Sequence, residues 1–106
     1  NNLQNDQLTF HFAVGNDWWF HAKQAPGSHV IVRTNGAELP DTTFEEAARL
    51  AAYYSSMRGS DKVEIDYIQK KHVKKPNGAK PGFVVYYTNY SLVIDSDISN
   101  IKNVQD

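Results

Sequence analysis

The segment from residue 42 to residue 59 constrains the fold most, because it carries the clearest helix signature in the chain. Thr42-x-x-Glu45 and Thr43-x-x-Glu46 both match the capping box, in which a hydroxyl and a carboxylate satisfy free backbone N–H groups. Gly59 supplies a left-handed stop. Between these signals, apolar residues recur at helical spacing: Phe44, Ala47, Ala48, Ala51 and Tyr54. The pattern predicts a helix over about 43–57, whose alanine stripe would let it approach a sheet closely.

Alternating apolar residues predict strands on both sides of this helix. Pro26-Gly27 predicts a turn that joins the first two strands as a hairpin. The last two strands are expected to form a second hairpin, and a short helix is expected over residues 5–13, with Asn5 as its N-cap. The expected strands span residues 17–22, 28–34, 63–68, 83–87 and 92–94. The order predicts an α+β fold: a largely antiparallel mixed sheet of about five strands, packed with one long helix and a short N-terminal helix.

The strand at residues 17–22 has large rings on both faces. Asp17, Trp19 and His21 share one face of an extended strand, and Trp18, Phe20 and Ala22 share the other. We therefore expect this strand either to be covered on both sides or to display one aromatic side chain to a ligand.

Length and composition fit one domain over residues 1–106, because single cores usually serve about 100–150 residues. The chain has no Cys, which excludes disulfides and thiolate metal sites and fits a cytoplasmic location. No apolar run approaches the roughly 18 residues of a membrane span, so no membrane partner is expected. The polar start without Met suggests a piece excised from a longer multidomain protein, and residues 96–106 are expected to be a frayed tail.

Positive charge is concentrated in one segment although the net charge is −1. No acidic residue lies between Asp66 and Asp95, and this stretch contains Lys70, Lys71, Lys74, Lys75 and Lys80. Lysine ammonium groups suit phosphate oxygens, and the Pro and Gly residues of the 74–82 loop allow a stiff backbone to approach a phosphodiester. The alternative is a solvated basic edge that discourages strand aggregation.

Aromatic residues near these cations could stack on unpaired bases. The candidates are Trp18 or Trp19 beside Lys23, and Tyr86, Tyr87 or Tyr90 near the basic loop. The alternative is that these rings belong to the core.

Asp17, His21 and His29 suggest an acid–base dyad or a set of zinc ligands. No HExxH motif and no glycine-rich phosphate loop accompanies them, so hydrogen bonds that fix a turn or contact a ligand are equally compatible. We expect no enzyme activity, no metal and no small-molecule cofactor.

Several motifs in order resemble the RNA-binding domain of the bacterial NFACT, fibronectin-binding-protein-A-like, ribosome quality-control factors. The resemblance covers about residues 1–95 and departs from the family at Gln24, where an acidic residue is common. The matching segments are Gln4–Asp6, Asp17–Lys23, Pro26–Ile31, Phe44–Ala48, Ala51–Ser55, Val73–Pro76 and Gly78–Gly82.

The resemblance implies a cytoplasmic factor that binds tRNA and the rRNA of an obstructed large ribosomal subunit and supports C-terminal alanine tailing of stalled chains. It points to Asp17, His21, the Pro26-Gly27-Ser28 turn and the basic loop. Together with the charge pattern, the expected RNA-binding residues are Asp17, His21, Lys23, Ser28, His29, Arg33, Lys70, Lys71, His72, Lys74, Lys75 and Lys80. Two alternatives remain: a protein-interaction or adhesin module that binds fibronectin, and a hydrolase that uses Asp17 and His21.

Overall fold

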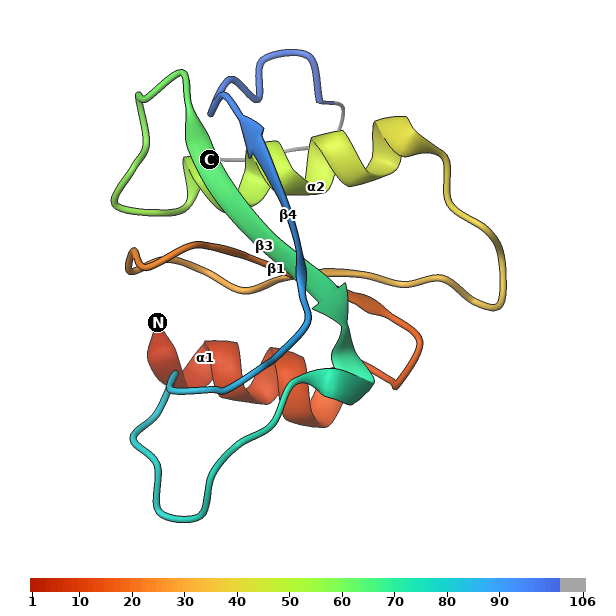
Figure 1. Cartoon of the computed structure of the whole chain (residues 1–106), viewed down its shortest axis with the longest axis vertical. Helices are drawn as coiled ribbons and strands as arrows, with labels where there is room; N and C mark the ends of the chain where they lie inside the picture. Colours follow the sequence, from red (N-terminus) through yellow and green to blue (C-terminus); the bar gives the residue numbers. More distant parts are fainter. Residues whose placement is uncertain (102–106) are drawn as a thin grey trace.

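A four-stranded antiparallel sheet with the strand order β2-β1-β3-β4 separates two helical layers in the computed structural model, which describes residues 1–101 (Figure 1). This arrangement confirms the α+β class, with one strand fewer than expected. The strands are β1 (Trp18–Ala22), β2 (Val30–Val32), β3 (Val63–Gln69) and β4 (Tyr90–Ile94). The register pairs Phe20 with both Val30 and Tyr67, so β1 lies at the centre of the sheet.

Helix α2 (Asp41–Tyr53) covers one face of the sheet (Figure 1). Its alanine stripe is buried against Phe20 and Ile65, as the spacing predicted. The expected capping boxes are wrong, because the helix begins directly after Pro40 and has no side-chain cap. The helix also ends four residues earlier than expected, and Gly59, with a φ of 96°, lies in the turns beyond it.

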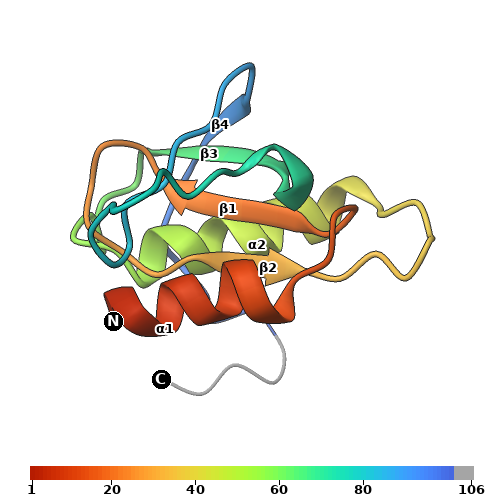
Figure 2. The ribbon, with the colours of Figure 1, turned by 90° about the horizontal axis from the view of Figure 1, so that it is seen from below.

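The opposite face is covered by α1 (Asn2–Gln7) and the π-helical turn η1 (Leu8–Phe12), as Figure 2 shows from below. The expected start at Asn5 is wrong, because Asn1 caps the helix by accepting a hydrogen bond from the Gln4 amide. Asn5 is buried instead: its side chain accepts from the His29 amide and donates to the Gly27 carbonyl. The N-terminal helix is thereby fastened to the turn between β1 and β2.

The expected hairpin between residues 83–87 and 92–94 is also wrong. Residues 83–87 form only an isolated bridge between Val85 and Lys74, and β4 pairs with β3 instead. The reason is packing: Val84 and Tyr86 cover Trp19 on the face opposite α2, which draws this segment away from the sheet plane. We call residues 83–87 the covering segment, and the 3-10 turn η2 (Lys70–His72) leads from β3 into the 74–82 loop that precedes it.

Strand β1 is covered on both sides, which confirms the first of the two alternatives expected for this strand. Trp19 and Phe20 are both fully buried, Trp19 beneath the covering segment and Phe20 beneath α2. At the C-terminal end, Ser96 lies in the tail that was expected to fray. Its hydroxyl accepts a hydrogen bond from the Gly59 amide, while residues 102–106 of that tail lie outside the described residues.

Candidate nucleic-acid interface

One lysine of the basic loop (residues 74–82), Lys75, anchors this loop to α1. The Nζ of Lys75 lies 3.1 Å from a carboxylate oxygen of Asp6 and also donates to the carbonyls of Lys80 and Phe83. The other Asp6 oxygen accepts from the Gly82 amide at 3.0 Å. Gly82 has a φ of 83°, and a Cβ there would lie 2.6 Å from the Asn2 side chain, so this position requires glycine. Lys75 therefore fixes the loop and does not point outward as a phosphate ligand would.

Its neighbour Lys74 points the other way. Lys74 and Val85 exchange two backbone hydrogen bonds of 2.9 Å in an antiparallel bridge, so their side chains lie on the same side. Because Val84 and Tyr86 pack inward against Trp19, the alternate residues of that segment face outward. The outward side chains are Lys74, Phe83, Val85 and Tyr87, and Tyr87 is 74% exposed.

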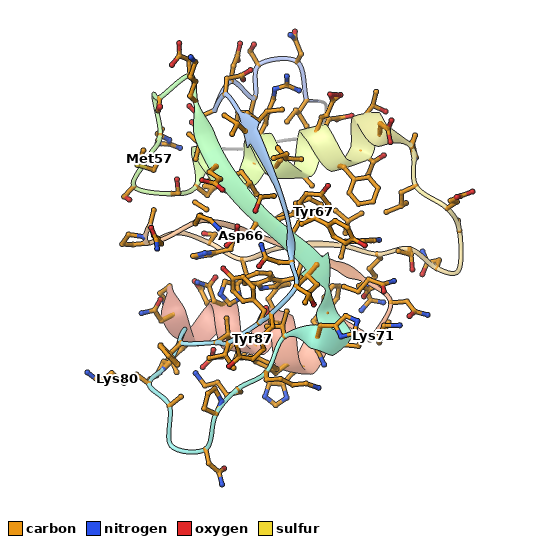
Figure 3. The ribbon with its side chains drawn as sticks, in the orientation of Figure 1. Met57, Asp66, Tyr67, Lys71, Lys80 and Tyr87 are labelled. Atoms are coloured by element: carbon orange, nitrogen blue, oxygen red, sulfur yellow. The ribbon has the colours of Figure 1, made fainter. Side chains whose placement is uncertain are left out.

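Two further exposed cations flank these residues. In the view of Figure 3, Tyr87 lies between Lys80 and Lys71, and both of these lysines are exposed. The Lys74 Nζ donates to the Lys71 carbonyl at 3.0 Å, so the ammonium group of Lys74 lies beside η2. We call this surface the basic–aromatic patch and define it as Lys71, Lys74, Lys80, Phe83 and Tyr87. A flexible ammonium group with three donors retains the capacity to bind a phosphate oxygen.

Lys70 and His72, the other expected residues of the basic segment, border the patch. Lys70 is half-buried, with its Nζ 5.8 Å from the centre of the Phe10 ring, and His72 is exposed.

Asp17 and His29, by contrast, are buried. The Asp17 carboxylate accepts hydrogen bonds from the backbone amides of Val14 and Thr34, at 2.9 and 3.3 Å. It thus ties the loop before β1 to the loop that follows β2. The alternating sequence pattern does not distinguish this structural role of Asp17 from ligand binding, because both roles are compatible with a carboxylate at this position.

His29 belongs to a buried ring cluster on the face opposite α2. Its Nδ1 lies 2.7 Å from the Thr9 hydroxyl, and its ring stands edge-on to both Trp19 and His21, with ring centres 5.2 and 5.3 Å apart. Burial, together with the neighbouring His21, lowers the pKa of His29 to about 4. Burial also lowers the pKa of His21. Both rings are therefore neutral at pH 7.

Lys23, Ser28 and Arg33 make internal contacts. The Lys23 Nζ lies 3.2 Å from Asp66, which keeps the pKa of this lysine raised. The Ser28 amide donates to the Tyr54 carbonyl at 2.9 Å. Arg33 is exposed but covers the Phe12 ring and donates to the Phe12 carbonyl. None of the three lies in the basic–aromatic patch.

The structure does not bring Asp17 and His21 together as a dyad. Asp17 lies in the bend before β1, whereas His21 lies within β1 and stacks on the Trp19 indole, with ring centres 5.7 Å apart. Within residues 1–101, no group of three His, Cys, Asp or Glu side chains is placed to hold a metal ion. No helix of that part of the chain is long and apolar enough to cross a membrane.

Phe83 was not expected as a surface aromatic. The sequence does contain the signal, since Phe83, Val85 and Tyr87 alternate with Val84 and Tyr86. Which of the two sets faces the core follows only from where the segment packs.

A small α+β domain that displays lysines beside exposed aromatic rings has the features of a nucleic-acid-binding module. The chain belongs to the family described as the NFACT protein RNA binding domain, which matches residues 1–88.

Curated relatives and a solved structure agree with this assignment. The chain is 45% identical to the Rqc2 homolog RqcH of Bacillus subtilis over 101 residues, and 45% identical to that of Streptococcus suis over 105 residues. These alignments cover 95% and 99% of the chain but only 17% and 19% of the relatives. It also matches the structure of the C-terminal of the fibronectin/fibrinogen-binding protein from Streptococcus suis, with a TM-score of 0.91 and 44% identity, over 100% of this chain and 42% of that one.

Proposed function

We propose that this chain is the RNA-binding module of a ribosome quality-control factor, and that it holds tRNA against the obstructed large ribosomal subunit during C-terminal alanine tailing. The proposal gives the module a binding and positioning role in the cytoplasm, without chemistry, metal or cofactor of its own. The observation that carries it is the shared outward face of Lys74, Phe83 and Tyr87, flanked by Lys71 and Lys80.

The patch suits an unpaired or irregular stretch of RNA. Lysines contact the phosphates, while Tyr87 and Phe83 offer ring faces on which bases stack without sequence preference. Asp6 does not oppose this binding, because its carboxylate is paired with Lys75. Shape and backbone recognition of this kind fits a module that meets the same RNA surface in every stalled complex.

Fluorescence anisotropy with labelled tRNA tests the proposal. Lys74→Gln should weaken binding severalfold, and Tyr87→Ala should weaken it by about tenfold, the usual loss for one stacked base. Lys62→Gln removes the same charge from an exposed lysine in the loop before β3 and should leave binding unchanged. Equal tRNA affinity in all four proteins would refute the patch as the interface.

Fibronectin binding is the competing function, because the Streptococcus suis structure carries that name. The same variants measured against immobilised fibronectin separate the two functions. Binding of fibronectin with no measurable tRNA binding would favour an adhesin module.

A further inference from the structure

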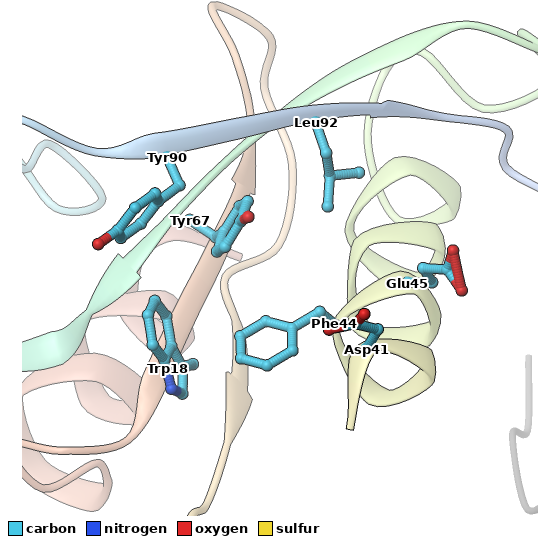
Figure 4. A pocket seen from close by; sticks show the side chains of 7 residues that line it. All are labelled: Trp18, Asp41, Phe44, Glu45, Tyr67, Tyr90 and Leu92. Atoms are coloured by element: carbon cyan, nitrogen blue, oxygen red, sulfur yellow. The ribbon is translucent and has the colours of Figure 1, made fainter. Parts of the chain in front are cut away.

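A second recognition surface lies between the first turns of α2 and the sheet, on the face opposite the ring cluster (Figure 4). It is an open pocket of about 390 Å³. Four aromatic rings and two carboxylates line it, with Leu92 at its rim: Trp18, Phe44, Tyr67, Tyr90, Asp41 and Glu45. None of these residues belongs to the basic–aromatic patch.

The rings form a partly open cage. Trp18 stands edge-on to Phe44 with ring centres 5.1 Å apart, and Tyr67 stacks on Tyr90 at 5.5 Å. Trp18 and Tyr90 have ring centres 6.0 Å apart, and Tyr67 lies within 5.9 Å of Trp18, so the rings form one continuous cluster along the pocket. Tyr90 is 58% exposed, so the cage opens to solvent at the β4 end.

The charged side chains that line this cage are negative. Its lining includes Asp41 and Glu45 and no lysine, arginine or histidine. An adjoining hollow shares Trp18 and Phe44 with it and adds Glu38, again with no basic residue in its lining. Ring faces attract cations through their quadrupole, and nearby carboxylates strengthen that preference. The same carboxylates repel a phosphate backbone, so RNA fits this pocket poorly.

The neighbouring strand indicates what carries the cation. In the described part of the chain, β4 is an edge strand that pairs only with β3. Tyr90 and Leu92 line the pocket from this strand. An extended peptide added to the free edge would place alternate side chains on the same face, beside the cage.

We propose that this pocket binds an arginine or lysine side chain of a basic polypeptide segment, which adds as a strand to the free edge of β4. The module then has two faces of opposite charge: the basic–aromatic patch for RNA, and the acidic aromatic pocket for a basic protein partner. The second face does not depend on the first being correct.

NMR titration of the isotope-labelled chain tests this proposal with a synthetic peptide of about seven residues in which arginine and valine alternate. The peptide should shift the backbone amides of Tyr67, Tyr90 and Leu92. A matched peptide with citrulline in place of arginine keeps the shape, loses the charge and should bind about fivefold more weakly. The double variant Asp41→Asn with Glu45→Gln should bind the arginine peptide about fivefold to tenfold more weakly. Asp61→Asn removes an exposed carboxylate before β3 and should leave the affinity for the arginine peptide unchanged.

Three results would overturn the proposal. One is no shift at these amides at millimolar arginine peptide. Another is equal affinity for the arginine and citrulline peptides. The third is that a uridine oligonucleotide shifts the NMR signals of the pocket amides while the arginine peptide does not. That result would show that the cage binds a nucleic-acid base.

Discussion

Protonation of His29 should destabilise the folded chain, because its ring is buried against Trp19 and His21 and hydrogen-bonds Thr9. In the unfolded chain the pKa returns to about 6.5, whereas in the folded chain it is about 4. The folded state therefore binds fewer protons than the unfolded state between these values. Stability is fully present above pH 6.5 and is lost as the pH falls towards 4.

The size of the effect follows from the two pKa values of His29. A difference of about 2.5 units corresponds to a loss of about 3 kcal/mol once both states are protonated. Between pH 7 and pH 5, the same linkage gives a loss of about 2 kcal/mol in the free energy of unfolding. The lowered pKa of His21 adds a loss of the same sign.

Urea unfolding followed by tryptophan fluorescence, at pH 7 and pH 5 and constant ionic strength, measures this loss. In His29→Gln, whose amide can still meet the Thr9 hydroxyl, the loss between the two pH values should shrink by about 2 kcal/mol. The exposed His11 provides the control, and His11→Gln should retain the wild-type pH dependence. An unchanged pH dependence in His29→Gln would refute the buried, neutral histidine.

Four further substitutions, one of them a control, test the scaffold by urea unfolding. Gly27→Ala would place a Cβ 2.8 Å from the Ser55 Cβ and should cost about 1–3 kcal/mol; a neutral outcome would contradict the close approach of the two turns. Lys75→Met should cost about 1–3 kcal/mol of unfolding free energy, because it leaves the Asp6 carboxylate on α1 without its cation. Lys74→Met is the control and should change stability by less than about 0.5 kcal/mol. Equal losses in the two variants would contradict the opposite orientations of Lys74 and Lys75. Tyr86→Phe should cost about 1–2 kcal/mol, because its hydroxyl donates to a buried carboxylate at 2.7 Å, and no loss would contradict that bond.

Local sequence patterns correctly predicted the elements whose structure depends little on contacts with other segments. The alanine stripe of α2 and the alternation of β1 and β3 are properties of single segments, and the structure confirms all three. The capping boxes failed because the helix already begins at Asp41, directly after Pro40, so Thr42 and Thr43 lie inside its first turn and not at the N-cap. Residues 83–87 have a strand pattern, but packing on Trp19 proved more favourable than pairing with β4.

The candidate site shows the same limit at the level of single residues. Lys74 and Lys75 are adjacent and chemically identical, yet one faces solvent and the other binds Asp6. This difference depends on the bridge to Val85 and on a carboxylate that lies 69 residues away in sequence. Local pattern alone contains neither contact. For Asp17 the same reasoning applies, because its partner at Thr34 follows from the β1–β2 register.

The salt dependence of tRNA binding tests the central claim most directly. Three outward lysines at the basic–aromatic patch predict that log affinity falls against log salt with a slope of about −2 to −3. Lys74→Gln should make the slope shallower by about 1, and Lys62→Gln should leave it unchanged. A slope near zero, or the same change in both variants, would contradict RNA binding through this patch.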